Sequence, residues 1–187
     1  MLAGGDAAMH IEAIKTRTQD GGQFGEILAH LGLRPDWGNI VPWSRWITPL
    51  APTMINKRFD ARFFLAAVPR DQEAQHDNYE ATESFWLRPR VVLEQFWAGE
   101  IALAPAQIMS MVALARCRRV AEILCAARGC RPPEIQPEPF AHEQGRAIAF
   151  PGSKWHPAPE RALPGPSFLI YRNERFEPAD GFEAFFA

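Results

Sequence analysis

The sequence predicts an α+β protein, because helix-like and strand-like patterns both occur along a single chain. Apolar residues recur at helical spacing in three separate segments, and residues 58–68 alternate in the way that a strand does. Beyond Pro132 the chain is rich in proline, which predicts an irregular extension with short strands. With 187 residues, 47% of them hydrophobic and 22% charged, the chain is long enough to bury one sizeable core.

The N-terminal part of the sequence predicts a polar segment followed by one helix. Residues 1–22 are mostly small or polar and end in glycine, so we expect a separate N-terminal segment. The next residues predict a short amphipathic helix, because their apolar side chains recur at helical spacing. These apolar residues are Phe24, Ile27, Leu28 and Leu31. Gly32 suits a left-handed cap at the end of this helix, and Pro35 prevents its continuation.

Two segments in the middle of the chain predict strands that are bounded by proline. Residues 43–48 are rich in aromatic and β-branched side chains and lie between Pro42 and Pro49. Residues 82–87 predict another strand, which ends before Pro89 because the proline ring restricts the residue ahead of it. We expect this strand to form a hairpin with the strand that precedes it.

Residues 58–68 form the clearest predicted strand. Polar and apolar side chains alternate along its first half, and the second half is apolar on both faces. We expect Phe59, Phe63 and Leu65 to form a continuous apolar face that belongs to the core.

Two more helices and the extension complete the predicted organisation. Residues 90–98 have helical spacing and end at Gly99, and residues 105–128 predict the longest helix. Short strands are expected at 147–150 and 168–171. The predicted organisation is therefore an N-terminal segment (1–22), a main domain (23–130) and a proline-rich extension (131–187).

Composition excludes several classes of partner. The net charge of −2 provides no strong positive field, so we expect no nucleic-acid partner. No apolar stretch approaches the roughly 18–20 residues of a membrane span, and the first residues lack the pattern of a signal peptide, so we expect no membrane partner.

The three cysteines, Cys117, Cys125 and Cys130, cannot all pair and show no zinc-site spacing. We therefore expect a reduced, cytoplasmic setting.

Several motifs occur in one order and spacing between about residues 23 and 125. They are Trp43-Ser44-Arg45-Trp46-Ile47-Thr48-Pro49, Lys57-Arg58-Phe59-Asp60-Ala61-Arg62-Phe63-Phe64, the carboxylates Asp77, Glu80 and Glu83, Trp86-Leu87-Arg88-Pro89 and Gly99-Glu100-Ile101-Ala102-Leu103. Together they resemble segments of Nudix hydrolases, most closely the peroxisomal coenzyme A diphosphatase branch. The resemblance implies a partial Nudix-type mixed sheet flanked by helices. It also implies hydrolysis of nucleoside diphosphate-linked compounds, with a small-molecule nucleotide as the partner.

The metal-binding signature of that family is missing from the sequence. The Nudix box, GX5EX7REUXEEXGU, gathers glutamates on one helix face to hold divalent cations. The chain contains no Arg-Glu and no Glu-Glu dipeptide, so the resemblance places it C-terminal to the box. In a complete family member Mg²⁺ or Mn²⁺ would polarise the diphosphate. We expect this chain alone to bind neither ion and to be inactive.

Arg58 and Arg62 are the candidate substrate-binding cations. They project from the same side of one predicted strand, with Asp60 between them, and guanidinium groups suit two-point contact with a diphosphate. The alternative is a structural role, in which both arginines form ion pairs with Glu80, Glu83 or Asp60.

Five carboxylates lie between Asp71 and Glu83 in a predicted polar loop. Glu80 is the candidate catalytic residue among them, because a carboxylate from such a loop could activate water beside the metals of a complete enzyme. The alternative is that the loop is simply a solvated surface turn.

Trp46 is the candidate for stacking on an adenine, although tryptophans in strands more often belong to a core. The late arginines either form a nucleotide patch or stabilise helix ends. They are Arg116, Arg118, Arg119, Arg128 and Arg131.

Two functional hypotheses follow from the resemblance and from the missing box. The first is a diphosphatase that acts on coenzyme A or acyl-coenzyme A. The second is a non-catalytic binding or interaction module that kept this part of the fold. The genomic DNA upstream of Met1 separates them, because an in-frame box there favours an ordinary hydrolase and stop codons favour a truncated gene or a pseudoenzyme.

We expect the purified chain to be dimeric or aggregation-prone. If upstream strands are missing, the strand at 58–68 lies at a sheet edge that exposes backbone donors and acceptors. Residues 1–22, the C-terminal extension or a second copy in a homodimer are the candidates to cover this edge. Light scattering tests the expectation, and a stable monomer at all concentrations would contradict it.

Overall fold

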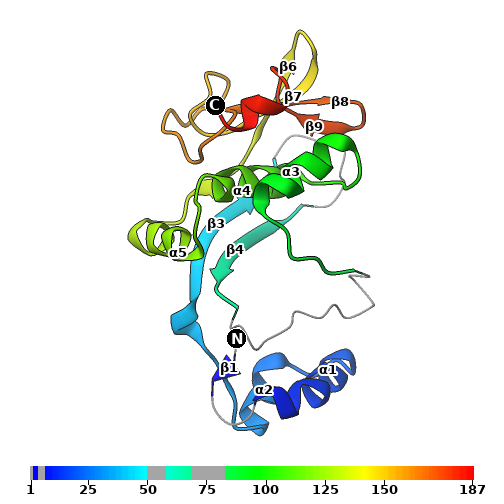
Figure 1. The fold of residues 1–187 in the computed structure, drawn as a ribbon, viewed down its shortest axis with the longest axis vertical. Helices are drawn as coiled ribbons and strands as arrows, with labels where there is room; N and C mark the ends of the chain where they lie inside the picture. Colours follow the sequence, from blue (N-terminus) through cyan, green and yellow to red (C-terminus); the bar gives the residue numbers. More distant parts are fainter. Residues whose placement is uncertain (1, 4–6, 50–57, 69–82) are drawn as a thin grey trace. The chain divides into compact units, whose positions relative to one another are not determined.

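The computed structural model describes residues 2–3, 7–49, 58–68 and 83–187. They group into two compact units (Figure 1). The N-terminal unit consists of Met1–Val41 and Leu65–Gln72, and the larger unit consists of Pro42–Phe64 and Glu73–Ala187. The predicted α+β class is confirmed, because both units combine helices with strands.

The N-terminal unit has one small apolar core. The 3-10 helix η1 (Ala7–His10) leads into α1 (Ile11–Gln19), and α2 (Phe24–His30) follows. Strand β1 (Leu2–Ala3) pairs antiparallel with β2 (Arg34–Pro35). The buried core residues are Ile14, Ile27, Leu28 and Leu33.

The predicted helix after residue 22 is confirmed, and Gly32 has the positive φ of +67° expected of a left-handed cap. The sequence patterns did not predict α1. This helix has few apolar residues, and Ile14 is its one buried side chain. Ile14 packs with residues of α2, so tertiary contact rather than a strong apolar stripe stabilises α1.

A mixed three-stranded sheet follows the 3-10 helix η2 (Trp37–Asn39). It contains β3 (Ile40–Ile47), β4 (Asp60–Ala66) and the two-residue β5 (Glu134–Ile135) in the order β4-β3-β5. Strand β5 runs parallel to β3, with Arg45 opposite Glu134 and Trp46 opposite Ile135. The predicted strands at 43–48 and 58–68 are therefore confirmed.

The predicted burial of the 58–68 strand was only partly right. Exposed and half-buried residues alternate along β4, and Phe63 packs against the main core. Phe59, however, is 53% exposed and precedes the strand, and Phe64 is 54% exposed. The physical reason is the position of β4, which is the outer strand of the sheet within the described residues.

The predicted strand and hairpin at 82–87 are wrong where the structure describes them. Residues 83–88 have no regular structure, and the sheet neighbour of β4 is β3 instead. Phe85 and Trp86 are largely exposed. Their aromatic composition is typical of a strand, but among the described residues the segment is part of no sheet and leads directly into the next helix.

Three helices follow in the larger unit: α3 (Pro89–Ala98), α4 (Pro105–Ala115) and α5 (Val120–Gly129). Proline occupies the first position of α3 and of α4, and Gly99 caps α3 with a φ of +81°. No helix within the described ranges combines the length and apolar character needed to cross a bilayer.

The single long helix predicted over 105–128 is wrong, because the chain leaves the helical path between α4 and α5. Arg119 has extended backbone angles at the start of α5. Glu122, three residues later, accepts a hydrogen bond from the backbone amide of Arg118 at 3.1 Å and one from Arg119 Nε at 2.8 Å. This carboxylate satisfies an amide ahead of α5 and so favours a new helix start at this point.

The C-terminal segment forms a four-stranded antiparallel sheet in the order β6-β7-β8-β9 (Figure 1). Its strands are β6 (Glu138–His142), β7 (Gly145–Ala149), β8 (Phe168–Arg172) and β9 (Arg175–Glu177), and the 3-10 helix η3 (Phe182–Phe185) follows. The predicted strands near 147–150 and 168–171 are confirmed, whereas β6 and β9 were not predicted.

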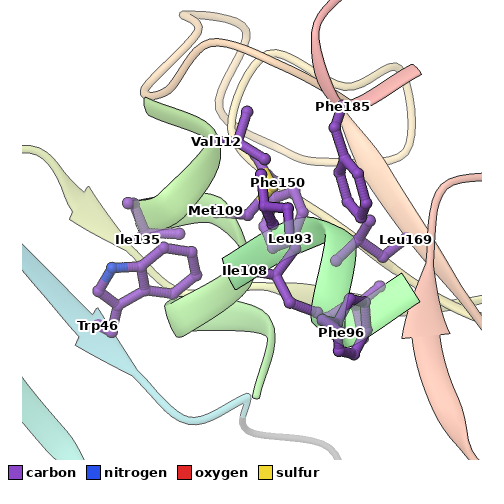
Figure 2. Close-up of a cluster of buried hydrophobic side chains, with 11 residues drawn as sticks. Trp46, Leu93, Phe96, Ile108, Met109, Val112, Ile135, Phe150, Leu169 and Phe185 are labelled. Carbon is purple, nitrogen blue, oxygen red and sulfur yellow. The ribbon is translucent and has the colours of Figure 1, made fainter. Parts of the chain in front are cut away.

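One hydrophobic core joins α3 and α4 to both sheets of the larger unit (Figure 2). Its buried residues are Trp46, Leu93, Phe96, Ile108, Met109, Val112, Ile135, Ile148, Phe150, Leu169 and Phe185. Gly165 belongs to the same packing, because a Cβ there would lie 2.4 Å from Val112 Cγ1. Five of the core residues follow residue 131, so the C-terminal segment is part of the folded core.

A buried ion-pair network fixes the end of α3 to the C-terminal sheet. The Glu177 side chain is 3% exposed and pairs with Arg172 and, at 2.9 Å, with Arg175. Arg175 Nη1 also donates hydrogen bonds to the carbonyl oxygens of Phe96 at 2.9 Å and Trp97 at 2.8 Å. These carbonyls lie in the last turn of α3, where the regular i+4 backbone donors of a helix are missing.

We predict that Phe96→Ala destabilises the chain by about 3–5 kcal/mol, because Phe96 is fully buried and its removal leaves a cavity. Phe59→Ala serves as the control and should cost less than about 1 kcal/mol, since Phe59 is exposed. Urea unfolding of both variants measures the difference. Equal losses of stability would show that the core is elsewhere.

Candidate functional site

A cavity of about 580 Å³ lies in the larger unit, between the β3–β4 pair and the segment that leads into β5. Its lining is unusually rich in arginine and contains few acidic groups. The lining residues are Pro42, Ser44, Arg45, Arg62, Phe63, Phe64, Arg131, Pro132, Pro133 and Glu134.

Arg45, near the C-terminal end of β3, fixes the walls of this cavity. Its Nε and Nη2 donate hydrogen bonds to the two carboxylate oxygens of Asp60 at 2.8 and 2.7 Å, and its Nη1 donates to Glu134. The backbone amide of Arg45 also donates to the carbonyl oxygen of Pro133 at 2.9 Å. One arginine therefore connects β4, β3 and β5.

These contacts shift the titration of both partners. The hydrogen bond from Arg45 holds the pKa of the Asp60 carboxyl below its usual range, and partial desolvation opposes this effect. The same hydrogen bond raises the pKa of Arg45, with a further contribution from Glu134. Two carboxylates thus compensate the charge of Arg45, which leaves it little capacity to bind an anion.

Arg62 and Arg131 are the cavity arginines whose charge is less compensated. The Arg62 side chain is 63% exposed, and its Nη2 lies 3.9 Å from Asp60 Oδ2, which is too long for a good hydrogen bond. Arg131 is exposed and forms no ion pair within the described part of the chain. Three arginines and one glutamate line the cavity, so it favours an anionic ligand.

The two candidate substrate-binding arginines, Arg58 and Arg62, have different positions in the structure. Arg58 precedes β4 and does not line the cavity, and its Nη2 lies 3.5 Å from the carbonyl oxygen of Thr48. Arg62 lies within β4 and does line the cavity. Of the two, Arg62 has the position from which a side chain can meet a cavity ligand.

Trp46 lies in the main core rather than at a surface. Its side chain is 5% exposed and makes an edge-on contact with Phe150 at a ring-centroid distance of 5.9 Å. Its Nε1 donates to Ser44 Oγ at 3.2 Å, so the indole nitrogen has a partner. This placement corresponds to the structural alternative considered for Trp46.

Glu80 lies outside the described residues, together with Asp71, Glu73 and Asp77. Glu83 is described and exposed. Within the described ranges no three His, Cys, Asp or Glu side chains gather as metal ligands do. The described residues therefore do not fit the divalent-cation site that Nudix chemistry uses, and we propose no metal-dependent role for them.

The sequence patterns did not predict the roles of Arg45 and Glu134, and they indicated Arg131 only as one of the late arginines. Arg45 stands in the Trp43–Pro49 motif, but its partner Glu134 is 89 residues away, and no local pattern shows that pairing. The five late arginines make different contacts in the structure. Arg119 pairs with Glu122 and Arg116 donates to the carbonyl oxygen of Ala187, whereas Arg131 alone of the five lines the cavity.

Comparison with known proteins decides the family. The family description "NUDT19 Nudix domain" matches residues 6–114, which is more than half of the chain. The chain belongs to the NUDT19 Nudix domain family. The Nudix resemblance predicted from the sequence is thereby confirmed. No solved structure matches the chain significantly.

Relatives of this Nudix protein are named acyl-coenzyme A diphosphatase NUDT19. The one from Gallus gallus is 31% identical over 98 residues, covering 51% of this chain and 26% of the relative. The one from Homo sapiens is 33% identical over 97 residues, covering 52% of this chain and 26% of the relative. The one from Xenopus laevis is 27% identical over 90 residues. The match thus spans about a quarter of the length of the first two.

The family match covers only part of this Nudix protein's cavity. Arg45, Arg62 and the phenylalanines lie within residues 6–114, whereas Arg131 and Glu134 lie beyond them. The cavity is therefore built jointly by the family-matched region and by the segment that follows it.

We predict that Asp60→Asn lowers the melting temperature at pH 7 by about 1–3 °C, because the variant removes one of the two charged partners of Arg45. Since the pKa of Asp60 is lower in the folded than in the unfolded chain, this stabilisation is complete above the ordinary value of 3.8. It disappears as the pH falls through the folded-state pKa, so the two melting temperatures should converge in acid.

Thermal unfolding between pH 7 and pH 2 measures this convergence. Asp180→Asn is the control, because Asp180 is exposed and has no ion pair in the described part of the chain. A constant difference between wild type and Asp60→Asn across the pH range would contradict the assigned role of Arg45.

Proposed function

We propose that the protein serves as the substrate-holding part of a Nudix-type hydrolase that acts on nucleoside diphosphate-linked compounds of the coenzyme A class. The observation that carries this proposal is the family match over residues 6–114 in the branch whose relatives are named acyl-coenzyme A diphosphatases.

The chemistry of the cavity supports this assignment. A coenzyme A diphosphate carries several negative charges, and arginine presents a planar fork that binds two phosphate oxygens at once. Arg62 from β4 lines a cavity of about 580 Å³, a size typical of sites for small organic ligands. Exposed Phe64 offers an apolar surface beside that charge.

The described residues hold substrate in this proposal and do not cleave it. In the complete reaction a water oxygen attacks one phosphorus atom, the bridging P–O bond breaks, and two phosphate-terminated products leave. Cavity arginines would orient the diphosphate and balance its charge. Activation of the water is left to groups that the described part of the chain does not contain.

A second candidate function is a non-catalytic module that binds the same class of ligand. The observation that favours it is the absence of any Arg-Glu or Glu-Glu dipeptide from the 187-residue sequence. Both candidates share the cavity, and they differ in whether a Nudix box acts together with this chain.

We predict that the purified 187-residue chain binds coenzyme A in the presence of EDTA but releases no phosphorylated product from it when Mg²⁺ is added. Binding depends on the cavity arginines, whereas turnover needs a cluster of oxygen ligands that the sequence does not encode as a box. Calorimetry measures binding, and chromatography of the products measures turnover.

Two outcomes would contradict the proposal. Turnover that is lost with EDTA would show that the chain carries its own metal site. Absence of coenzyme A binding would remove the substrate-holding role. ADP-ribose and NADH, tested in parallel, show whether other diphosphates are accepted.

A further inference from the structure

We infer that Arg131, which lies beyond the family-matched region, is a binding residue that holds the phosphate of the ligand together with Arg62. This inference rests on the proposed function and deepens it, because it names a residue that selects the ligand. The ligand class is an organic phosphate whose anionic group adjoins a planar or apolar part.

The backbone fixes the position from which Arg131 acts. Pro132 and Pro133 follow it directly, and each proline ring fixes its own backbone φ angle. The carbonyl oxygen of Pro133 accepts a hydrogen bond from the Arg45 amide at 2.9 Å, and Ile135 of β5 is fully buried in the core. The segment is therefore ordered before any ligand arrives, which lowers the entropic cost of binding.

The balance of charge in the cavity favours Arg62 and Arg131 as the anion-binding pair. Arg45 is occupied by Asp60 and Glu134, as its three hydrogen bonds show. Arg62 has only a 3.9 Å approach to Asp60, and Arg131 has no ion pair within the described ranges. These two guanidinium groups come from segments that are far apart in the sequence, and both line the same cavity.

The apolar lining indicates that the ligand is more than an inorganic anion. Phe63 and Phe64 of β4 line the cavity together with Pro42 and Pro132. Phe64 is 54% exposed, so a planar group can cover its ring and gain apolar contact. A phosphate alone would leave this surface in water, whereas a nucleoside phosphate can use both the charge and the ring.

The test measures binding of ADP and of inorganic pyrophosphate to the full chain by calorimetry, with EDTA present to exclude metal-bridged binding. Arg62→Gln and Arg131→Gln should each weaken ADP binding about tenfold or more, because each removes a charged hydrogen-bond donor. Arg118→Gln is the matched control, since Arg118 is exposed and does not line the cavity, and it should bind within about twofold of wild type. Arg131→Lys, which keeps the charge and loses the fork, should bind with intermediate affinity.

Phe64→Ala tests the apolar part of the inference. It should weaken binding of ADP severalfold and leave pyrophosphate binding unchanged, because pyrophosphate has no ring to cover Phe64. Circular dichroism of every variant checks that the fold is retained.

The outcomes separate this inference from the proposed function. If Arg62→Gln weakens ADP binding and Arg131→Gln does not, the role of Arg131 is wrong while the proposed function stands. If Arg118→Gln weakens binding as much as Arg131→Gln, the loss of affinity comes from the reduced net positive charge of the protein and not from a contact in the cavity. The inference is then overturned. If the wild-type chain binds neither ADP nor coenzyme A, both fail.

Discussion

The Arg45 guanidinium connects its own strand, β3, to β4 and to β5, whose Glu134 lies 89 residues further along the chain. It binds Asp60 of β4 through two hydrogen bonds and Glu134 of β5 through a third. Strand β5 has only two residues, so its backbone ladder alone fixes it weakly. The side-chain contacts therefore hold the wall that carries Arg131 and the proline pair, and the shape of the cavity depends on them.

This arrangement divides the cavity arginines by task. Arg45 is paired with two carboxylates and acts as a structural cation. The positive charges of Arg62 and Arg131 are compensated much less by carboxylates within the described residues. The positive character of the cavity therefore does not come from the number of arginines alone. It arises because the acidic partners are placed on Arg45 and not on its neighbours.

The sequence was informative where local physics decides the outcome and uninformative where tertiary contacts do. Helices α2 and α3 were predictable, because apolar spacing and the glycines at 32 and 99 mark them. The break before α5 contains no proline or glycine to mark it and is accompanied by contacts of Glu122 with Arg118 and Arg119, so the apolar pattern continues through it. Strand β5 is held by a pairing across 89 residues, which no local pattern shows. For the same reason Arg62 was predicted as a ligand-binding residue, whereas Arg131 was interpreted only as one of several cations near a helix end.

The buried Glu177 constrains how this protein can change over evolution. Its carboxylate is shared by Arg172 and Arg175, and Arg175 also holds the last carbonyls of α3. Loss of one arginine would leave a buried charge with half its compensation, which is more costly than loss of the whole network. We therefore expect positions 172, 175 and 177 to be replaced in concert, so that a lineage retains the three charged residues or exchanges them together for an apolar set.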